Sequence, residues 1–249
     1  MVILKRPEEI EKMRASSQIV AEVLNVIKER VEPGVTTADL DRLAEELTRK
    51  KGAVPAFKGY RGYPFSLCIS VNSEVVHGMP SNRVLIDGDI VSIDFGVNYK
   101  GYYGDAALTV PVGNISDEAN RLIKITEEGL YHGIEEARAG NRLGDISSAI
   151  QVCIEKAGYS VVRDFVGHGI GKSLHEEPQI PNFGKKGRGI EIKTGMVLAI
   201  EPMVNEGTYQ VRVLDNGWTV VTQDGKLSAH FEHSVAITTN GPDILSMVH

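Results

Sequence analysis

Two aspartates lie eleven residues apart in the segment Asp94-Phe-Gly-Val-Asn-Tyr-Lys-Gly-Tyr-Tyr-Gly-Asp105. Residues 98–101 predict a turn, and a hairpin centred on Tyr99 and Lys100 pairs Asp94 directly with Asp105. Opposed residues on one face of such a hairpin have Cβ atoms about 4.5–5.5 Å apart. Two carboxylates at that separation repel each other unless one holds a proton or a cation lies between them. The pair therefore indicates a cation site, although two solvent-facing aspartates would produce the same spacing.

Two glutamates are placed in or beside apolar strands. Glu201 ends the run Met196-Val-Leu-Ala-Ile200, and Glu232 lies in His230-Phe-Glu-His-Ser-Val-Ala-Ile237. In the second run, alternation puts Glu232 on one face with His230, Ser234 and Ala236. A carboxylate in a buried strand is unfavourable unless it is paired or bound to a metal. Both glutamates are thus candidate ligands, with an exposed strand end as the simpler interpretation of Glu201.

Three histidines occupy positions that could line a cleft. His168 lies between two glycines, which allow backbone and ligand to approach closely. His175 follows seven residues later, and His77 closes an apolar run at a turn. A lone histidine is more often a hydrogen-bonded structural residue than a ligand. Four carboxylates with one imidazole nevertheless favour Mn, Fe, Co or Zn, in pairs where carboxylates bridge.

Helices must bring these distant residues together. Pro7 followed by two glutamates predicts a helix start, and Pro33-Gly34 ends the segment. A second helix is expected over 37–51, a third over 116–138 and a fourth over 145–156. A shift of 106 residues superposes the glycines and several other residues of the two helix pairs. The pattern predicts one α+β domain of two helix–helix–strand halves, about 1–110 and 111–249, with chance similarity as the alternative. Strands are expected over 84–86, 90–96, 196–204, 208–213, 218–222 and 230–238.

Composition narrows the classes of function. The net charge of −6 over 249 residues, with no basic stretch, argues against nucleic-acid binding. Cys68 and Cys153 are expected to be reduced thiols rather than a disulfide framework. The sequence shows neither a signal-peptide apolar region nor a run of about 18 apolar residues. A cytoplasmic protein that does not enter a membrane is expected.

The combination of Asp94, Asp105, Gly-His-Gly at His168, Glu201-Pro202 and Phe-Glu-His-Ser around Glu232 resembles the pita-bread metallopeptidases. Within them it is similar to the type I methionine aminopeptidases, from the first helix to about residue 239. The resemblance implies a pseudo-symmetric α+β fold around a central antiparallel sheet and two divalent ions, Co, Mn, Fe or Zn. It implies that Asp94 chelates one metal, that Asp105 and Glu232 bridge both, and that His168 and Glu201 complete the second metal's shell.

The resemblance also implies roles beyond the metal ligands. Glu201 becomes a proton shuttle, and His77 and His175 contact the scissile peptide and stabilise the tetrahedral intermediate. An apolar methionine pocket falls on Phe57, Tyr60, Tyr63, Cys68, Leu174 and Trp218, although aromatic residues and cysteine are core residues by default. The family often has Cys at the position of Phe57 and Phe at that of Leu174, which leaves the pocket's shape open.

A short bacterial-style enzyme fits best, because room for a long N-terminal extension and for the helical insertion of type II is lacking. It would be a monomer that removes the initiator methionine from nascent chains near the ribosome when the second residue is small. Rival interpretations are a proline-specific aminopeptidase of the same fold, a non-catalytic peptide-binding module and an α+β scaffold with exposed acids. The first typically carries a large N-terminal domain, and the second usually loses ligands.

Overall fold

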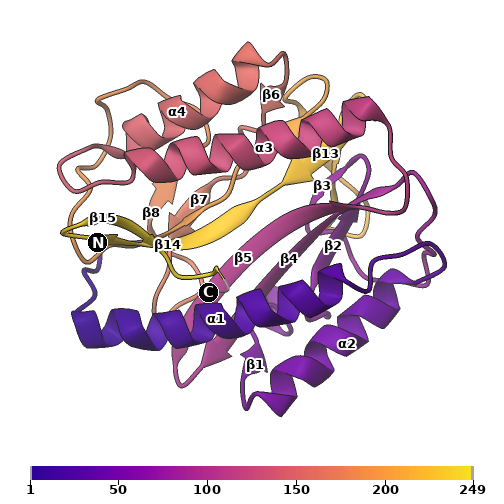
Figure 1. Cartoon of the computed structure of the whole chain (residues 1–249), viewed down its shortest axis with the longest axis horizontal. Helices are drawn as coiled ribbons and strands as arrows, with labels where there is room; N and C mark the ends of the chain where they lie inside the picture. Colours follow the sequence, from indigo (N-terminus) through magenta and orange to yellow (C-terminus); the bar gives the residue numbers. More distant parts are fainter. Residues whose placement is uncertain (1, 248–249) are drawn as a thin grey trace.

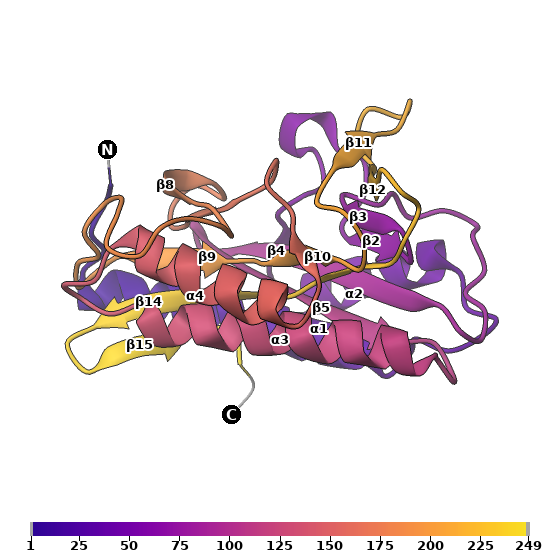
Figure 2. The ribbon, with the colours of Figure 1, turned by 90° about the horizontal axis from the view of Figure 1, so that it is seen from above.

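The computed structural model describes residues 2–247 and contains a long curved sheet with helices on one side (Figure 1). The four α-helices of this part of the chain are α1 (Pro7–Lys28), α2 (Thr37–Lys50), α3 (Asp117–Glu136) and α4 (Leu143–Lys156). Figure 2 shows them along one face of the sheet, while β8 and the β11–β12 hairpin rise from the opposite face. Within these residues no helix combines the length and apolarity needed to cross a membrane.

The principal sheet has the strand order β1-β4-β5-β14-β9-β7-β8, with β2 paired to β4 and β15 paired to β14. Every one of these pairs is antiparallel. Its strands are β1 (Val54–Pro55), β2 (Cys68–Val71), β4 (Ile90–Tyr99), β5 (Tyr102–Pro111), β7 (Gly167–Gly169), β8 (Glu176–Ile180), β9 (Val197–Ile200), β14 (Glu232–Thr238) and β15 (Gly241–Ile244).

Two small sheets and one short helix complete the described residues. One sheet joins β6 (Ser160–Val161), β10 (Met203–Asn205) and β13 (Ser228–His230). The other joins β3 (Glu74–Val76), β11 (Val211–Val213) and β12 (Val220–Thr222). A 3-10 turn, η1 (Tyr60–Gly62), lies between β1 and β2.

The predicted helices are confirmed to within a few residues at their ends. Local side chains explain where they begin: the hydroxyl of Thr36 accepts the N–H of Asp39, and that of Ser116 accepts the N–H of Ala119. Such caps satisfy backbone donors that have no partner inside the helix. The stops after α2 and α4 are Gly52 (φ 69°) and Gly158 (φ 92°), which adopt the left-handed conformation that favours glycine.

Elements of the two predicted halves recur at a constant offset along the chain. α4 begins and ends 106 residues after α2, and β6 begins and ends 106 residues after β1. The fold is therefore the expected pseudo-symmetric α+β arrangement of two helix–helix–strand halves around a central antiparallel sheet. The organisation as one domain, whose two halves meet near residue 110, stays a prediction.

Several predicted strands differ from the structure. Residues 84–86 form no strand, because only Val84 makes an isolated bridge, to Thr36. The strand expected over 196–204 is interrupted at Glu201 and Pro202, where proline lacks the N–H that a ladder needs. The strand expected over 230–238 is interrupted at Phe231. The segments 208–213 and 218–222 shorten to β11 and β12, whereas 90–96 extends to Tyr99.

The helices and the sheet enclose two apolar clusters. One packs α3 and α4 against β9 and β14, and the other packs α1 and α2 against β4 and β5. Glycines allow the closest approaches: a Cβ on Gly104 of β5 would lie 2.6 Å from the backbone nitrogen of Ser17 in α1. A Cβ on Gly133 of α3 would lie 2.7 Å from the Ile150 side chain in α4. Helix position over the sheet thus depends on the absence of side chains at these glycines.

Candidate metal centre

The five predicted ligands line a single pocket on the helix-free face of the sheet. They come from adjacent strands: Asp94 from β4, Asp105 from β5, Glu232 from the first residue of β14, and His168 from β7. Glu201 follows the last residue of β9 directly, at the interruption of the predicted strand. The antiparallel sheet therefore brings together residues from positions 94 to 232 by placing their strands side by side.

The register of the β4–β5 hairpin differs from the prediction by two residues. Asp94 pairs with Ala107, and Gly96 pairs with Asp105. The two-residue loop consists of Lys100 (φ 51°) and Gly101 (φ 82°), and such left-handed loops match the twist of the flanking strands. The prediction that Asp94 and Asp105 pair directly was wrong. Because side chains alternate with a period of two, the shift still leaves them on one face, as diagonal neighbours.

Burial dominates the electrostatics of the carboxyl groups. It raises the pKa of Asp94 to about 7. It also raises the pKa of Asp105 and of Glu232, with the nearby carboxylates as a further cause. The pKa of Glu201 is raised by burial and by the charge of Asp94. Four acids that share one buried space favour their neutral forms until a cation compensates their charge.

The donor atoms fit a divalent cation. One ligand atom each from Asp105, His168 and Glu232 lies within 4.8 Å of the others. An oxygen of Asp94, of Asp105 and of Glu232 is buried without a hydrogen-bond partner among the described residues. Buried polar atoms normally have a hydrogen-bond partner, so these oxygens indicate that the site binds a ligand such as a cation. Carboxylates with one imidazole suit borderline and hard divalent ions.

His168 is held in the form that binds metals. Its Nδ1 lies 2.9 Å from the carbonyl oxygen of Gly169, which can only accept a hydrogen bond. The proton is therefore on Nδ1, and the lone pair of Nε2 faces the pocket, 3.4 Å from Oε1 of Glu201. Burial lowers the pKa of His168 to about 4, so the ring is neutral at neutral pH.

The two other predicted histidines line the same pocket. The ring of His175 lies 4.3 Å from that of His168, and its Nδ1 is 2.9 Å from the hydroxyl of Tyr60. Although His175 is partly exposed, burial of its ring and the neighbouring His168 lower the pKa of His175 to about 3. His77 packs edge-on against Phe165 and Trp218, and burial lowers its pKa. Both can donate a hydrogen bond without carrying a charge.

An apolar wall adjoins the acids. It consists of the six residues predicted for a side-chain pocket, Phe57, Tyr60, Tyr63, Cys68, Leu174 and Trp218. Tyr63 and Trp218 meet edge to face with ring centroids 5.0 Å apart. Cys68 is a free thiol, paired in register with Asp94, and burial raises its pKa. A neutral, polarisable wall beside a polar floor suits an apolar side chain.

Two residues of the site had no predicted role. His230 is buried on the face that alternation assigned to it, and its Nε2 lies 3.8 Å from Oε2 of Glu201. Its position beside Glu232 was the available signal. Arg61 also lines the pocket, at its exposed rim. No pattern in the sequence could place it there, because its position follows from the irregular turn η1 (Tyr60–Gly62).

Comparison with known proteins assigns the class. Residues 11–239 match metallopeptidase family M24, and the chain belongs to that family. Two relatives that it matches over their full length are methionine aminopeptidases, from Clostridium perfringens with 60% identity and from Bacillus subtilis with 54%. Each comparison covers 100% of both chains.

Solved structures agree. The crystal structure of methionine aminopeptidase from Thermotoga maritima superposes with a TM-score of 0.98 and 48% identity, and 100% of each chain is covered. An Xaa-Pro dipeptidase from Bacillus anthracis gives a TM-score of 0.79 at 23% identity and is covered over 62% of its length. That second similarity shows the shared fold alone.

Proposed function

We propose that this chain is a metalloaminopeptidase that removes the N-terminal methionine from polypeptides whose second residue is small. The observation that carries the proposal is that four carboxyl groups, those of Asp105 and Glu232 from buried residues, line one pocket with a neutral imidazole and an apolar wall. Full-length identity of 54–60% to methionine aminopeptidases supports the same substrate. The type I class of these enzymes and cleavage of the initiator methionine are part of the proposal.

On this proposal the ligand set would hold two divalent ions, of Co, Mn, Fe or Zn. Asp94 would hold one ion, Asp105 and Glu232 would contact both, and His168 with Glu201 would hold the other. The unpartnered oxygens of Asp94, Asp105 and Glu232 support these roles. When bound, such ions supply Lewis acidity and lower the pKa of water.

Side chains of the pocket would supply the proton transfer and the hydrogen bonds of the reaction. Glu201 would accept the proton of the attacking water and return it to the leaving amine. His77 and His175 face the site as neutral donors and would stabilise the charge that develops on the carbonyl oxygen. His175 is oriented for this by the hydroxyl of Tyr60.

The apolar wall would take the methionine side chain. Tyr63, Cys68 and Trp218 offer aromatic edges and sulfur to a thioether, a contact that is favourable for a polarisable group. Phe57 and Leu174 are both buried and apolar in this wall. The wall therefore stays apolar although the family often has Cys and Phe at these two positions. Tyr60 links the wall to His175.

The substrate would be the N-terminus of nascent chains, reached near the ribosome by a cytoplasmic monomer. The net charge of −6 supports a protein that does not bind nucleic acid directly.

The peptide assay tests the assignment. Metal-loaded protein should release methionine from Met-Ala-Ser and spare Met-Leu peptides, with Co, Mn, Fe and Zn tested separately. Cleavage of X-Pro peptides instead would move the chain to the proline-specific enzymes. Absence of turnover with every metal would favour a peptide-binding module. Elemental analysis of anaerobically purified protein would show which ion it carries and in what ratio.

A further inference from the structure

Arg61 is the one lysine or arginine among the described residues that line the pocket. Its side chain is exposed, whereas Asp105, His168 and Glu232 are buried at the floor, so Arg61 stands at the rim. Its guanidinium lies 5.3 Å from the ring centroid of Tyr60, whose hydroxyl contacts His175. Within residues 2–247 it forms no ion pair.

The backbone holds Arg61 firmly at this place. The N–H of Gly59 donates to the carbonyl of Tyr63 over 2.7 Å, and the N–H of Tyr63 donates to the carbonyl of Tyr60 over 3.0 Å. Arg61 itself has a left-handed φ of 49° at the tip of this closed turn. A short loop tied in this way fixes the origin of the side chain, while the guanidinium remains free to meet a ligand.

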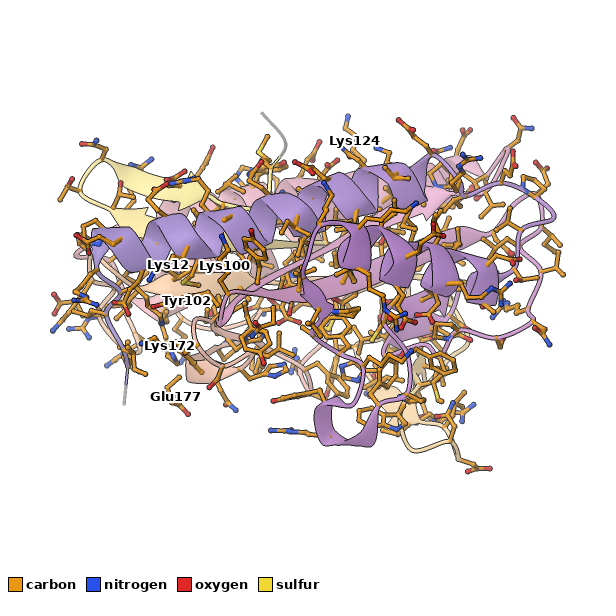
Figure 3. All side chains as sticks on the ribbon, turned by 90° about the horizontal axis from the view of Figure 1, so that it is seen from below. Lys12, Lys100, Tyr102, Lys124, Lys172 and Glu177 are labelled. Atoms are coloured by element: carbon orange, nitrogen blue, oxygen red, sulfur yellow. The ribbon has the colours of Figure 1, made fainter. Side chains whose placement is uncertain are left out.

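A second site in the chain has the same local structure without the same location. Lys100 also follows a tyrosine, precedes a glycine and has a left-handed φ of 51°, and its ammonium lies 4.8 Å from the Tyr99 ring. It lies at the β4–β5 turn beside α1 and lines no part of the pocket (Figure 3). Stacking and backbone conformation therefore do not set Arg61 apart. Its place at the mouth of the pocket does.

A bound peptide would leave the pocket through its open side, where Arg61 and His175 are the exposed lining residues. Once the first residue occupies the apolar wall, the chain beyond the cleaved bond runs outward, at about 3.3–3.6 Å per residue. The third and fourth residues are then the ones that come within reach of an arginine side chain on the rim. A guanidinium recognises carboxylates, which it can bind with two parallel hydrogen bonds.

We propose that Arg61 binds a carboxylate of the peptide substrate beyond the cleaved bond and favours aspartate or glutamate at its third and fourth positions. The inference rests on the proposed aminopeptidase function. Because the contact is exposed, its effect on kcat/KM is modest, roughly two- to fivefold, and is screened by salt.

The test uses metal-loaded protein and C-terminally amidated peptides Met-Ala-Glu-Glu, Met-Ala-Lys-Lys and Met-Ala-Gly-Gly. The measured quantity is the ratio of kcat/KM for the acidic peptide to that for the basic one. Relative to wild type, Arg61→Asn should lower this ratio, Arg61→Glu should lower it further, and Arg61→Lys should preserve most of it. Added sodium chloride should reduce the difference between wild type and Arg61→Glu. The unamidated Met-Ala-Gly-Gly peptide shows whether a C-terminal carboxylate is bound as well.

Lys100→Asn and Lys100→Glu are the matched controls, since they make the same charge change in the same backbone conformation. Both should leave the ratio unchanged. The proposal is overturned if Arg61→Glu alters the ratio no more than Lys100→Glu does. Failure to cleave even the glycine peptide would instead refute the aminopeptidase function. The same comparison would then be made on calorimetric Kd values of the uncleaved peptides, with the same two outcomes.

Discussion

At the scale of single residues, the pocket is defined by acids that are unfavourable in the protein alone. Asp105 shows this most clearly: it is buried, one of its oxygens has no hydrogen-bond partner among the described residues, and Asp94 adds repulsion. A bound cation would coordinate the same oxygen and offset the cost of burying Asp105. The residue should therefore matter for metal binding more than for the stability of the metal-free chain.

Replacing Asp105 with asparagine tests this. Asp105→Asn removes one buried acid, so the melting temperature of the chelator-treated protein should stay the same or rise. The stabilisation that metal gives the wild type, about 2.7 kcal/mol at a hundredfold excess over Kd, should be lost together with methionine release. Differential scanning calorimetry with and without metal measures both. The exposed residue Asp215 provides the control variant, Asp215→Asn, and full activity of Asp105→Asn would contradict the bridging role.

At the scale of elements, the strand interruptions shape the site. β9 ends at Ile200, so Glu201 leaves the ladder and its side chain reaches the pocket, while Pro202 prevents the strand from continuing. The second interruption, at Phe231, lets β13 and β14 enter different sheets with His230 and Glu232 still on the pocket side. The β4–β5 hairpin, in contrast, is regular over ten residue pairs and provides a rigid support for both aspartates.

That support depends on the contact between α1 and β5. Gly104→Ala would bring a Cβ within 2.6 Å of the Ser17 backbone nitrogen, and neither backbone can move freely. The overpacking should cost about 1–3 kcal/mol of the free energy of unfolding, measured by urea denaturation. At Gly184 a Cβ would meet only the Ser147 side chain, at 3.2 Å, so Gly184→Ala should cost less. Equal midpoints for the two variants would contradict the proposed close packing.

At the scale of the whole molecule, the proposed ligands come from both predicted halves. Asp94 and Asp105 belong to the first half, and His168, Glu201 and Glu232 to the second. A bound cation would therefore connect the halves across the centre of the sheet. Binding of metal to the native state and not to the unfolded chain raises the stability of the entire fold.

This connection should depend on pH. A raised carboxyl pKa means that the metal-free fold keeps protons which the unfolded chain has released, so this contribution lowers stability as pH rises from about 4 to 7. The buried histidines act with the opposite sign, because the pKa of His168 is lowered to about 4 and the unfolded chain binds the extra proton. As pH rises, the carboxyl groups therefore lower the stability of the metal-free protein while the buried histidines raise it.

Metal binding isolates the carboxyl contribution. Because Asp94, whose pKa is about 7, must ionise to hold a cation, binding should release its proton below about that pH, and the metal Kd should fall as pH rises towards it. Calorimetry in two buffers with different ionisation enthalpies counts the released protons. A Kd that is independent of pH between 5.5 and 7.5, roughly the range around the pKa of Asp94, would show that Asp94 is already ionised in the metal-free protein.

Much of this molecule could be read from its sequence, because the relevant signals are local. The proline and acidic residues at the first helix start and the glycine stops predicted the four helices to within a few residues, because these signals act between near neighbours in the chain. Alternation predicted that Glu232 and His230 point to the same side, and both side chains lie beside the site although the chain changes sheet between them. The order and spacing of the five candidate ligands indicated the family before any geometry was available.

Tertiary structure decided what depends on distant contacts. The register of the β4–β5 hairpin follows from the left-handed pair Lys100–Gly101 and made Asp94 and Asp105 diagonal neighbours instead of a direct pair. Only the folded sheet brings β7, β9 and β14 beside them, because strand order is set by packing that no short segment encodes. The location of Arg61 at the rim follows in the same way from a turn packed at the edge of the site.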